Sequence, residues 1–310
     1  MNKLNLRLLI IVLSSISAHF STQAQNHIVD RFTIRKSFQT KEDWAKPAVI
    51  TFTKPQEKSA SWLLDMAIGY SAYHHPKGTV SVIPYMELHR STLIDKPQSV
   101  WIGGVATEWR MNSLEHKKWS PVLVQSFKFM EDKIKQNASF QSNFYLTPVF
   151  AFKDMNPKYF WIPNHPVSLG SRLSFVYTPY IGIENENRTY AENSLSAGNI
   201  YRAFGRISTD ITFYPSNNSL KGKLDLSLDW QYRYNYYQTV SDVKNSTQQF
   251  LNTSLNYTFF TSADGKKMSQ IGFDYVIGEN PTEGFEKQSF YTVALKFRLN
   301  LGGNKTKEVL

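Results

Sequence analysis

The sequence predicts an all-β protein, a closed antiparallel transmembrane β-barrel of about twelve strands in up-and-down meander order. Apolar and polar residues alternate over long segments, and such alternation places them on opposite faces of a strand. The alternating segments recur between residues 44 and 301. No segment after residue 24 is a run of about 18 apolar residues, so a membrane form of this chain must cross with strands that close on themselves.

Residues 1–24 are expected to be a secretory signal peptide. Lys3 and Arg7 precede the apolar run Leu8–Val12, and Thr22-Gln23-Ala24 is a small-residue cleavage site. The apolar run is too short to cross a bilayer as a helix, so it takes no part in the predicted fold. Because the chain is exported, nucleic acid is not an expected partner.

The rest of the chain divides into three predicted parts. Residues 25–43 are a polar, basic arm that lies in the periplasm or enters the lumen. Residues 44–301 form the barrel, and residues 302–310 form a polar C-terminal tail.

The clearest strand is Leu224–Tyr236. Its even-numbered residues are Leu, Trp and Tyr, whereas its odd-numbered residues are Asp, Ser, Gln, Arg and Asn. The segment is longer than a usual globular strand of about 5–6 residues and matches a tilted strand that crosses a membrane. Four further segments share the pattern: Leu169–Ile183, Tyr201–Phe213, Leu251–Phe259 and Tyr291–Leu299.

Weaker alternation completes the strand count. Turn-forming residues separate several candidates, at Pro76–Gly78, Ser216–Asn218 and Ala263–Gly265. The weaker strands are Trp44–Thr53, Ser61–Tyr70, Val80–Arg90, Val100–Arg110, Trp119–Met130, Asn143–Phe152 and Gln270–Ile277. Four prolines fall in or beside strands and predict bulges or displaced boundaries, because proline cannot donate to the ladder: Pro84, Pro121, Pro148 and Pro179.

Alternate connections differ in length, which predicts the orientation of the barrel. Outer-membrane barrels have short periplasmic turns and longer external loops. The longer set is therefore assigned outside, and both ends of the barrel lie in the periplasm. The loops of that set are 91–99, 131–142, 184–199, 237–247 and 278–288.

A soluble exported β-protein is the alternative fold. In a soluble sandwich apolar and polar residues also alternate along each strand, but the strands are shorter and the apolar face points inward. Aromatic residues near segment ends, such as Trp62, Trp101 and Trp119, favour girdles at the two membrane interfaces, although aromatic rings also serve cross-strand packing.

Composition excludes several kinds of chemistry. The chain has no cysteine, which rules out disulfides, thiolate metal sites and cysteine nucleophiles. The formal net charge of +10 attracts acidic solutes or head groups without identifying one. No spacing typical of a metal site or a cofactor-binding loop is present, so we expect neither a metal nor a cofactor.

The polar strand faces are predicted to line the lumen. Acidic residues lie on early strands and basic residues on middle strands, which favours a transverse field in a narrow conduit for a polar solute. The alternative is a charge-paired network that fills the lumen of a non-conducting scaffold. The predicted lumen-lining residues are Asp65, Glu87, Glu108, Arg110, Arg172, Arg202, Arg206, Asp210, Asp225, Asp229, Arg233, Asp274, Lys296 and Arg298.

A second alternative is enzymatic. His89 and Ser91 share one face of a strand with Glu87, a spacing that allows a histidine base to meet a serine hydroxyl, as in lipid acyl hydrolases. The pattern is short and arises by chance, so the chain is not expected to be an enzyme.

Long alternating segments after an export signal resemble those of Gram-negative outer-membrane β-barrel proteins, and the Thr22-Gln23-Ala24-Gln25 junction resembles those common in the Bacteroidota. The resemblance implies a location in the cell outer membrane, with outer-membrane lipid and the barrel-assembly machinery as partners. The polar tail departs from the terminal aromatic residue of many such barrels. Because the family extends from porin-like pores to lipid enzymes and anchors, the resemblance selects no solute or protein partner.

Overall fold

The structure is a computed structural model that describes residues 31–38, 46–53, 61–75, 79–92, 97–112, 118–150, 162–190, 197–214, 220–241, 243, 246–280 and 286–300. The predicted signal peptide and the C-terminal tail lie outside the described residues. The strands are β1 (Phe32–Arg35), β2 (Ala48–Thr53), β3 (Ser61–Tyr70), β4 (Tyr73–His74), β5 (Val80–Ser91), β6 (Gln98–Arg110), β7 (Trp119–Asp132), β8 (Asn137–Phe150), β9 (Val167–Leu169), β10 (Leu173–Tyr190), β11 (Gly198–Phe213), β12 (Leu224–Gln238), β13 (Thr247–Thr261), β14 (Lys267–Asn280) and β15 (Glu286–Asn300).

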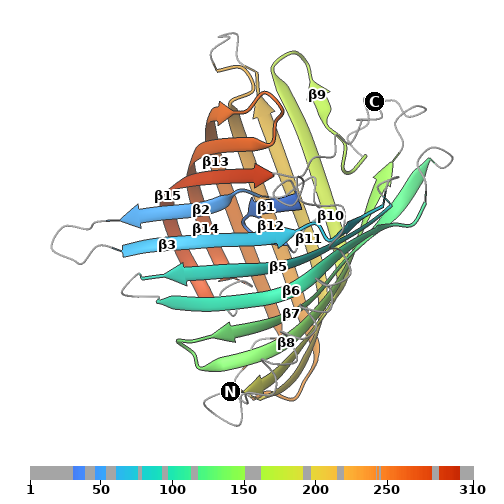
Figure 1. Cartoon of the computed structure of the whole chain (residues 1–310), viewed down its shortest axis with the longest axis vertical. Helices are drawn as coiled ribbons and strands as arrows, with labels where there is room; N and C mark the ends of the chain where they lie inside the picture. The colour runs from blue at the N-terminus through green and yellow to red at the C-terminus, as the bar shows by residue number, and fades with distance from the viewer. Residues whose placement is uncertain are drawn as a thin grey trace, which may run out of the picture.

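Twelve of the described strands form a closed ring (Figure 1). They are β2, β3, β5 to β8 and β10 to β15, and each pairs antiparallel with its neighbour along the chain. The ring closes where β15 pairs with β2, with Leu295 opposite Ile50. The short strands β4 and β9 pair with β5 and β10. The predicted fold class, a closed antiparallel meander of twelve strands, is confirmed.

The closing strand of the ring is built from two collinear pieces, β1 and β2. Both pair with β3, and the register places Arg35 opposite Ala67 and Val49 opposite Asp65. One residue separates Asp65 from Ala67, whereas thirteen residues (36–48) separate Arg35 from Val49. The ladder therefore continues from β1 to β2 with a surplus of twelve residues, 36–47, which we call the insert.

The register on the other side of the closing strand gives the same surplus. Ile34 lies opposite Leu299 and Ile50 opposite Leu295, so fifteen residues (35–49) face three (296–298). The expected strand at residues 44–53 is thus shorter than predicted, because β2 begins at Ala48. Part of the segment predicted as an arm, Phe32–Arg35, belongs to the wall instead.

Strands β10 and β11 are longer than the alternation predicted. β10 continues to Tyr190 and β11 begins at Gly198, so most of the segment predicted as the loop 184–199 is paired sheet. The extension carries Glu184 and Glu186 into the barrel, where both are buried.

Each proline has a regular partner on one side and lies where the ladder ends on the other. The predicted bulges were wrong, because Pro84 lies opposite Val105, Pro121 opposite Pro148, and Pro179 opposite Ile207. The β3–β5, β6–β7 and β8–β10 ladders end one or two residues from these prolines, at Tyr85, Val122 and Ile181. An antiparallel strand directs alternate N–H groups to alternate neighbours, so one missing donor need not shift the register. The register shifts fall between other residues: Arg188/Tyr190, Tyr201/Arg202 and Thr258/Phe260.

The two faces of the wall are opposite in character. On β12, Leu228, Trp230 and Tyr234 are exposed on the outside, while Asp229 and Arg233 are buried on the inside. Two apolar clusters add to the interior: Phe38, Ala67, Ile83, Tyr85, Val100, Ile102, Ala106 and Met130 in one, and Val122, Val124, Tyr145, Tyr180 and Phe204 in the other. No helix among the described residues is long and apolar enough to cross a membrane.

Candidate functional site

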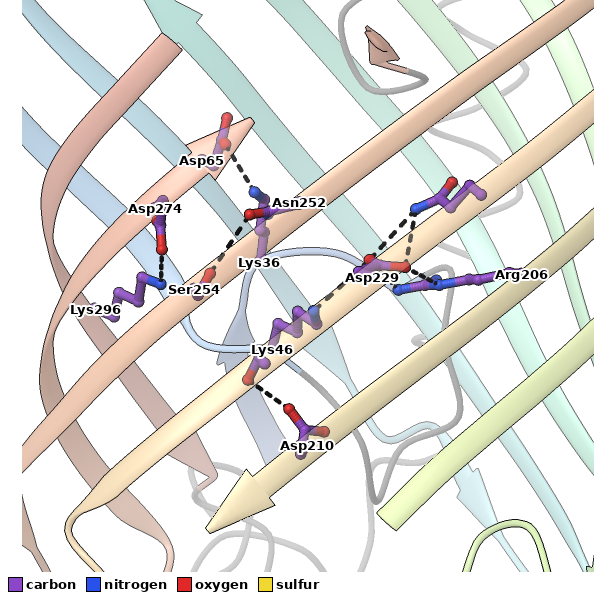
Figure 2. Close-up of polar contacts among 12 residues, drawn as sticks. Lys36, Lys46, Asp65, Arg206, Asp210, Asp229, Asn252, Ser254, Asp274 and Lys296 are labelled. Carbon is purple, nitrogen blue, oxygen red and sulfur yellow. Dashed lines mark hydrogen bonds and ion pairs between the residues drawn. The ribbon is translucent and has the colours of Figure 1, made fainter. Parts of the chain in front are cut away.

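The two described ends of the insert are joined to each other and contact distant parts of the wall. The backbone N–H of Lys36 donates to the carbonyl oxygen of Lys46 over 2.8 Å. Lys36 Nζ lies 3.4 Å from Asp65 on β3, and Lys46 Nζ lies 3.7 Å from Asp229 on β12 (Figure 2). Because β12 is four places around the ring from β2, these contacts join separate parts of the wall.

Phe38 fixes the insert against β5. Its backbone N–H donates to the Glu87 carboxylate over 2.8 Å, and the Ser37 hydroxyl donates to the same oxygen over 2.9 Å. The Phe38 ring stacks on Tyr85 with ring centroids 5.1 Å apart, and the Arg35 guanidinium lies 3.7 Å from the Phe38 ring centroid. The described ends of the insert are therefore tied to both β5 and β12.

A side chain at Gly69 is predicted to displace Phe38. A Cβ built at Gly69 overlaps the Phe38 ring and lies 2.9 Å from Ile83 Cγ2. We expect Gly69→Val to lower the free energy of unfolding by about 1–3 kcal/mol, the usual cost of overpacking, in denaturant titrations of the refolded barrel. Gly103→Val is the matched control, because nothing lies within 4 Å of a Cβ at that position. Equal stability of the two variants would contradict the packing of Phe38 on β3.

His89 joins two of the predicted lumen carboxylates. Its Nδ1 lies 3.0 Å from Asp65, its Nε2 lies 3.1 Å from Glu87, and the ring is fully buried. A ring with a carboxylate at each nitrogen donates from both, which is the imidazolium form. Neither nitrogen is then placed to take a proton from Ser91, which is buried on the same strand face. Among the described residues no group of three or more His, Asp or Glu side chains is arranged to hold a metal ion.

A second charge network lies on β10, β11 and β12. Arg233 donates to both oxygens of Glu184, over 2.8 and 3.0 Å, and Arg202 donates to Glu186 over 2.7 Å. Arg206 donates to both oxygens of Asp229 over 2.7 Å each. All six side chains are buried. A buried charge without a partner costs several kcal/mol, so these pairs neutralise the interior rather than leave a charged channel.

A cavity of about 360 Å³ opens toward the end of the barrel where β11, β13 and β15 finish. Its walls combine polar side chains with apolar ones such as Val49, Val176 and Met268. Figure 2 shows five of its charged residues around the base of the insert: Lys36, Lys46, Asp210, Asp274 and Lys296. The charged lining residues are Lys36, Lys46, Asp210, Asp225, Asp274, Lys296 and Arg298, and the neutral polar ones include Thr212, Ser227, Asn252, Ser254, Asn256 and Gln270.

The structure places the sequence-predicted residues as follows. Arg172 is exposed in the turn between β9 and β10, outside the lumen. The structure pairs Arg206 with Asp229 and Lys296 with Asp274. The other predicted residues lie at inward positions of their strands: Asp65, Glu87, Glu108, Arg110, Arg202, Asp210, Asp225, Arg233 and Arg298. The expected transverse field is largely cancelled, because the early acids meet His89 and Lys36 while Arg202 and Arg206 meet carboxylates.

Sequence reasoning missed the carboxylates on the extended part of β10 and the two lysines of the insert. Glu184 and Glu186 continue the even-numbered inward phase of Thr178 and Tyr180, and that parity was the signal that could have found them. Lys36 and Lys46 had no such signal, since the ladder contacts that place the insert are distant in sequence.

The geometry defines a class of protein: an all-β closed barrel with an apolar exterior and a charge-paired interior. No family model matches the chain, and no curated protein matches it. One solved structure with some likeness comes from work described as "Unveiling the Mechanism Behind the in-meso Crystallization of Membrane Proteins"; the alignment covers 81% of each chain, with a TM-score of 0.39 and 10% identity. A likeness at this level has no bearing on function.

Proposed function

We propose that the chain is an outer-membrane β-barrel whose lumen is closed across its middle, a scaffold or binding barrel rather than an open pore. The observation that supports a membrane location is the outer face, where each of the twelve ring strands carries at least one large exposed apolar residue. Ile181 is 67% exposed and Tyr291 is 68% exposed. Apolar surface of this extent is typical of a surface that contacts lipid or a partner.

Strand length supports the same proposal. The shortest of the strands β5 to β8 and β10 to β15 has 12 residues and the longest has 18, and a tilted strand needs about 9–11 to cross a bilayer. A closed ring also satisfies the backbone groups of every strand, as hydrocarbon requires. A soluble barrel would place its apolar residues inside, whereas this one buries charged residues such as Glu87 and Arg233.

Three observations favour a closed lumen. The insert joins β5 to β12, the Arg–carboxylate pairs occupy β10 to β12, and two apolar clusters fill space between them. We propose no catalytic role for His89, Ser91 and Glu87, because both imidazole nitrogens face carboxylates.

A conduit for a polar solute is the second candidate function. One observation favours it: the ladder is in register across the insert, so the barrel wall is complete without these residues. In this alternative the insert can leave the passage, so the wild type itself conducts. Recording of the wild type therefore separates the two candidates, and removal of the insert shows which residues close the lumen; both experiments are described in the Discussion.

Ile181→Arg tests the membrane location. Ile181 lies near the middle of β10 and points outward. In a bilayer an outward arginine at this depth is expected to lower the free energy of unfolding by about 2–4 kcal/mol, measured by denaturant titration in lipid vesicles. In water the same exposed substitution changes stability by no more than about 0.5 kcal/mol.

Ala263→Arg is the matched control for that test. Ala263 is exposed in the turn between β13 and β14, beyond the strands, so its substitution is expected to be neutral in vesicles. Equal and small effects of the two arginines would refute the membrane location and favour a soluble exported barrel.

A further inference from the structure

The barrel wall contains a gap in which β8 and β10 do not pair. Their ladder ends where Leu146 lies opposite Ile181, although β8 continues to Phe150. Among the described strands, residues 147–150 of β8 pair with β7 alone, and residues 176–180 of β10 pair with β11 alone. We call the space between these two unpaired edges the seam.

Two prolines explain why the ladder stops. Continued in the same register, it would place Pro148 opposite Pro179. The Pro148 carbonyl accepts from Asn164 Nδ2 and the Tyr177 carbonyl accepts from the Asn164 backbone N–H, so both carbonyls are directed into the seam. Backbone groups of alternate strand residues point to the same neighbour, so Pro179 faces the seam as well. The pair that would join the two strands therefore has no N–H donor on either side.

One side chain bridges the two edges of the seam. Asn164 Nδ2 donates to the Thr147 hydroxyl over 2.9 Å and to the Pro148 carbonyl over 2.7 Å. Its Oδ1 accepts from the Thr178 hydroxyl over 3.0 Å. Both threonines are buried on the inner face, so the bridge closes the seam from the inside.

The seam separates an apolar outer surface from the cavity. Ile181 and Ile207 are exposed on the outer face of β10 and β11 beside it. On the inside, Val176 and Pro166 line the cavity, and Pro166 is only two residues from Asn164. Displacement of this one short segment would thus connect the cavity to the hydrocarbon of a bilayer.

We propose that the seam is a lateral entrance for a single-chain amphiphile, whose acyl chain lies in the seam and whose polar head occupies the cavity. The unpaired edge of β8 is roughly 13 Å long and one side chain spans the gap, so the seam fits one acyl chain rather than two. The cavity volume of about 360 Å³ falls in the range of small-molecule sites. The inference rests on the proposed membrane location and adds to it an entrance and a class of ligand.

Fluorescence quenching in phosphatidylcholine vesicles tests the proposal. The chain has no cysteine, so single introduced cysteines place a bimane fluorophore at chosen positions of the full chain. The probe is dibromostearate, whose bromine atoms quench bimane on contact. We expect a saturable loss of fluorescence with Val176→Cys and none with Ser254→Cys. Ser254 is the matched control, because it lines the same cavity in the same row of paired residues but lies three strands from Val176.

Two further changes test the seam itself. Asn164→Gly removes the bridge but accommodates the φ of 60° at this position. Loss of the three side-chain hydrogen bonds should lower the dibromostearate concentration for half-quenching of Val176→Cys by at least about tenfold. Pro148→Val with Pro179→Val restores both N–H donors and should abolish this quenching in the Asn164→Gly background. Heat-dependent gel mobility verifies that each variant is folded.

Ile181→Cys is the control for the membrane, because Ile181 points outward. Quenching of Ile181→Cys without quenching of Val176→Cys, even with Asn164→Gly, would refute the entrance and leave the membrane location standing. Equal quenching of Val176→Cys and Ser254→Cys would also overturn the proposal, since the probe would then have entered through the open end of the cavity. Absence of quenching at all three positions would overturn the membrane location and the entrance with it.

Discussion

Replacement of Arg233 by methionine is expected to lower the free energy of unfolding by about 3–5 kcal/mol. The guanidinium donates to both oxygens of Glu184, and both side chains are buried. Methionine replaces the aliphatic stem but not the charge, so Glu184 is left as a buried carboxylate that still accepts from the Tyr145 hydroxyl but has lost its paired guanidinium. Removing one partner of a buried pair costs far more than the pair contributes, because the other charge stays desolvated.

Denaturant titration of the refolded barrel measures this loss, and two further variants identify its cause. Glu184→Gln combined with Arg233→Met removes the orphaned charge and should recover most of the lost stability. Arg172→Met removes an exposed arginine and should change stability by no more than about 0.5 kcal/mol. If the double variant is as unstable as Arg233→Met alone, the loss comes from packing and not from the uncompensated carboxylate.

The fold was predictable from the sequence because apolar and polar residues alternate along each strand, and the two faces of the strand lie in different environments. On Leu224–Tyr236 the apolar phase faces outward and the polar phase inward, as the pattern predicted. The same parity placed Asp65, Glu87 and Asp229 on the inner face. The predicted positions were wrong only near the ends of β10. Arg172 lies in a turn and not on the strand, and Glu184 lies on the strand although it was predicted to be in a loop.

The pairing of the lumen charges was not predictable from the sequence. Arg233 and Glu184 are 49 residues apart and meet across β11, whereas Lys46 and Asp229 are further apart still and meet through the insert. Acidic early strands and basic middle strands suggested a field across the lumen. The structure instead neutralises Asp65, Arg202 and Arg233 locally, because the extended β10 and the insert bring in carboxylates and ammonium groups of the opposite sign.

Removal of the insert is expected to open the barrel without unfolding it. Deleting residues 36–47 joins Arg35 to Ala48 in the register that both neighbouring strands already have. Twelve is an even number, so inward and outward positions keep their alternation. Asp65 and Asp229 lose a lysine, and Glu87 loses the Ser37 and Phe38 donors, but all three keep another partner: Asp65 and Glu87 contact His89, and Asp229 contacts Arg206.

A second variant keeps the backbone of the insert. Lys36→Met with Lys46→Met removes the two ammonium groups but retains Phe38 and its hydrogen bond to Glu87. This variant should remain closed if the chain segment obstructs the lumen, and it should conduct if the two charges alone do so.

Planar-bilayer recording of the wild type beside the folded deletion variant is the most direct test of a closed membrane barrel. We predict no stable conductance steps for the wild type and discrete steps for the variant lacking residues 36–47. Steady conductance through the wild type would contradict the closed lumen. A folded deletion variant that stays silent would contradict closure by the insert and leave the wall networks of β10 to β12 as the obstruction.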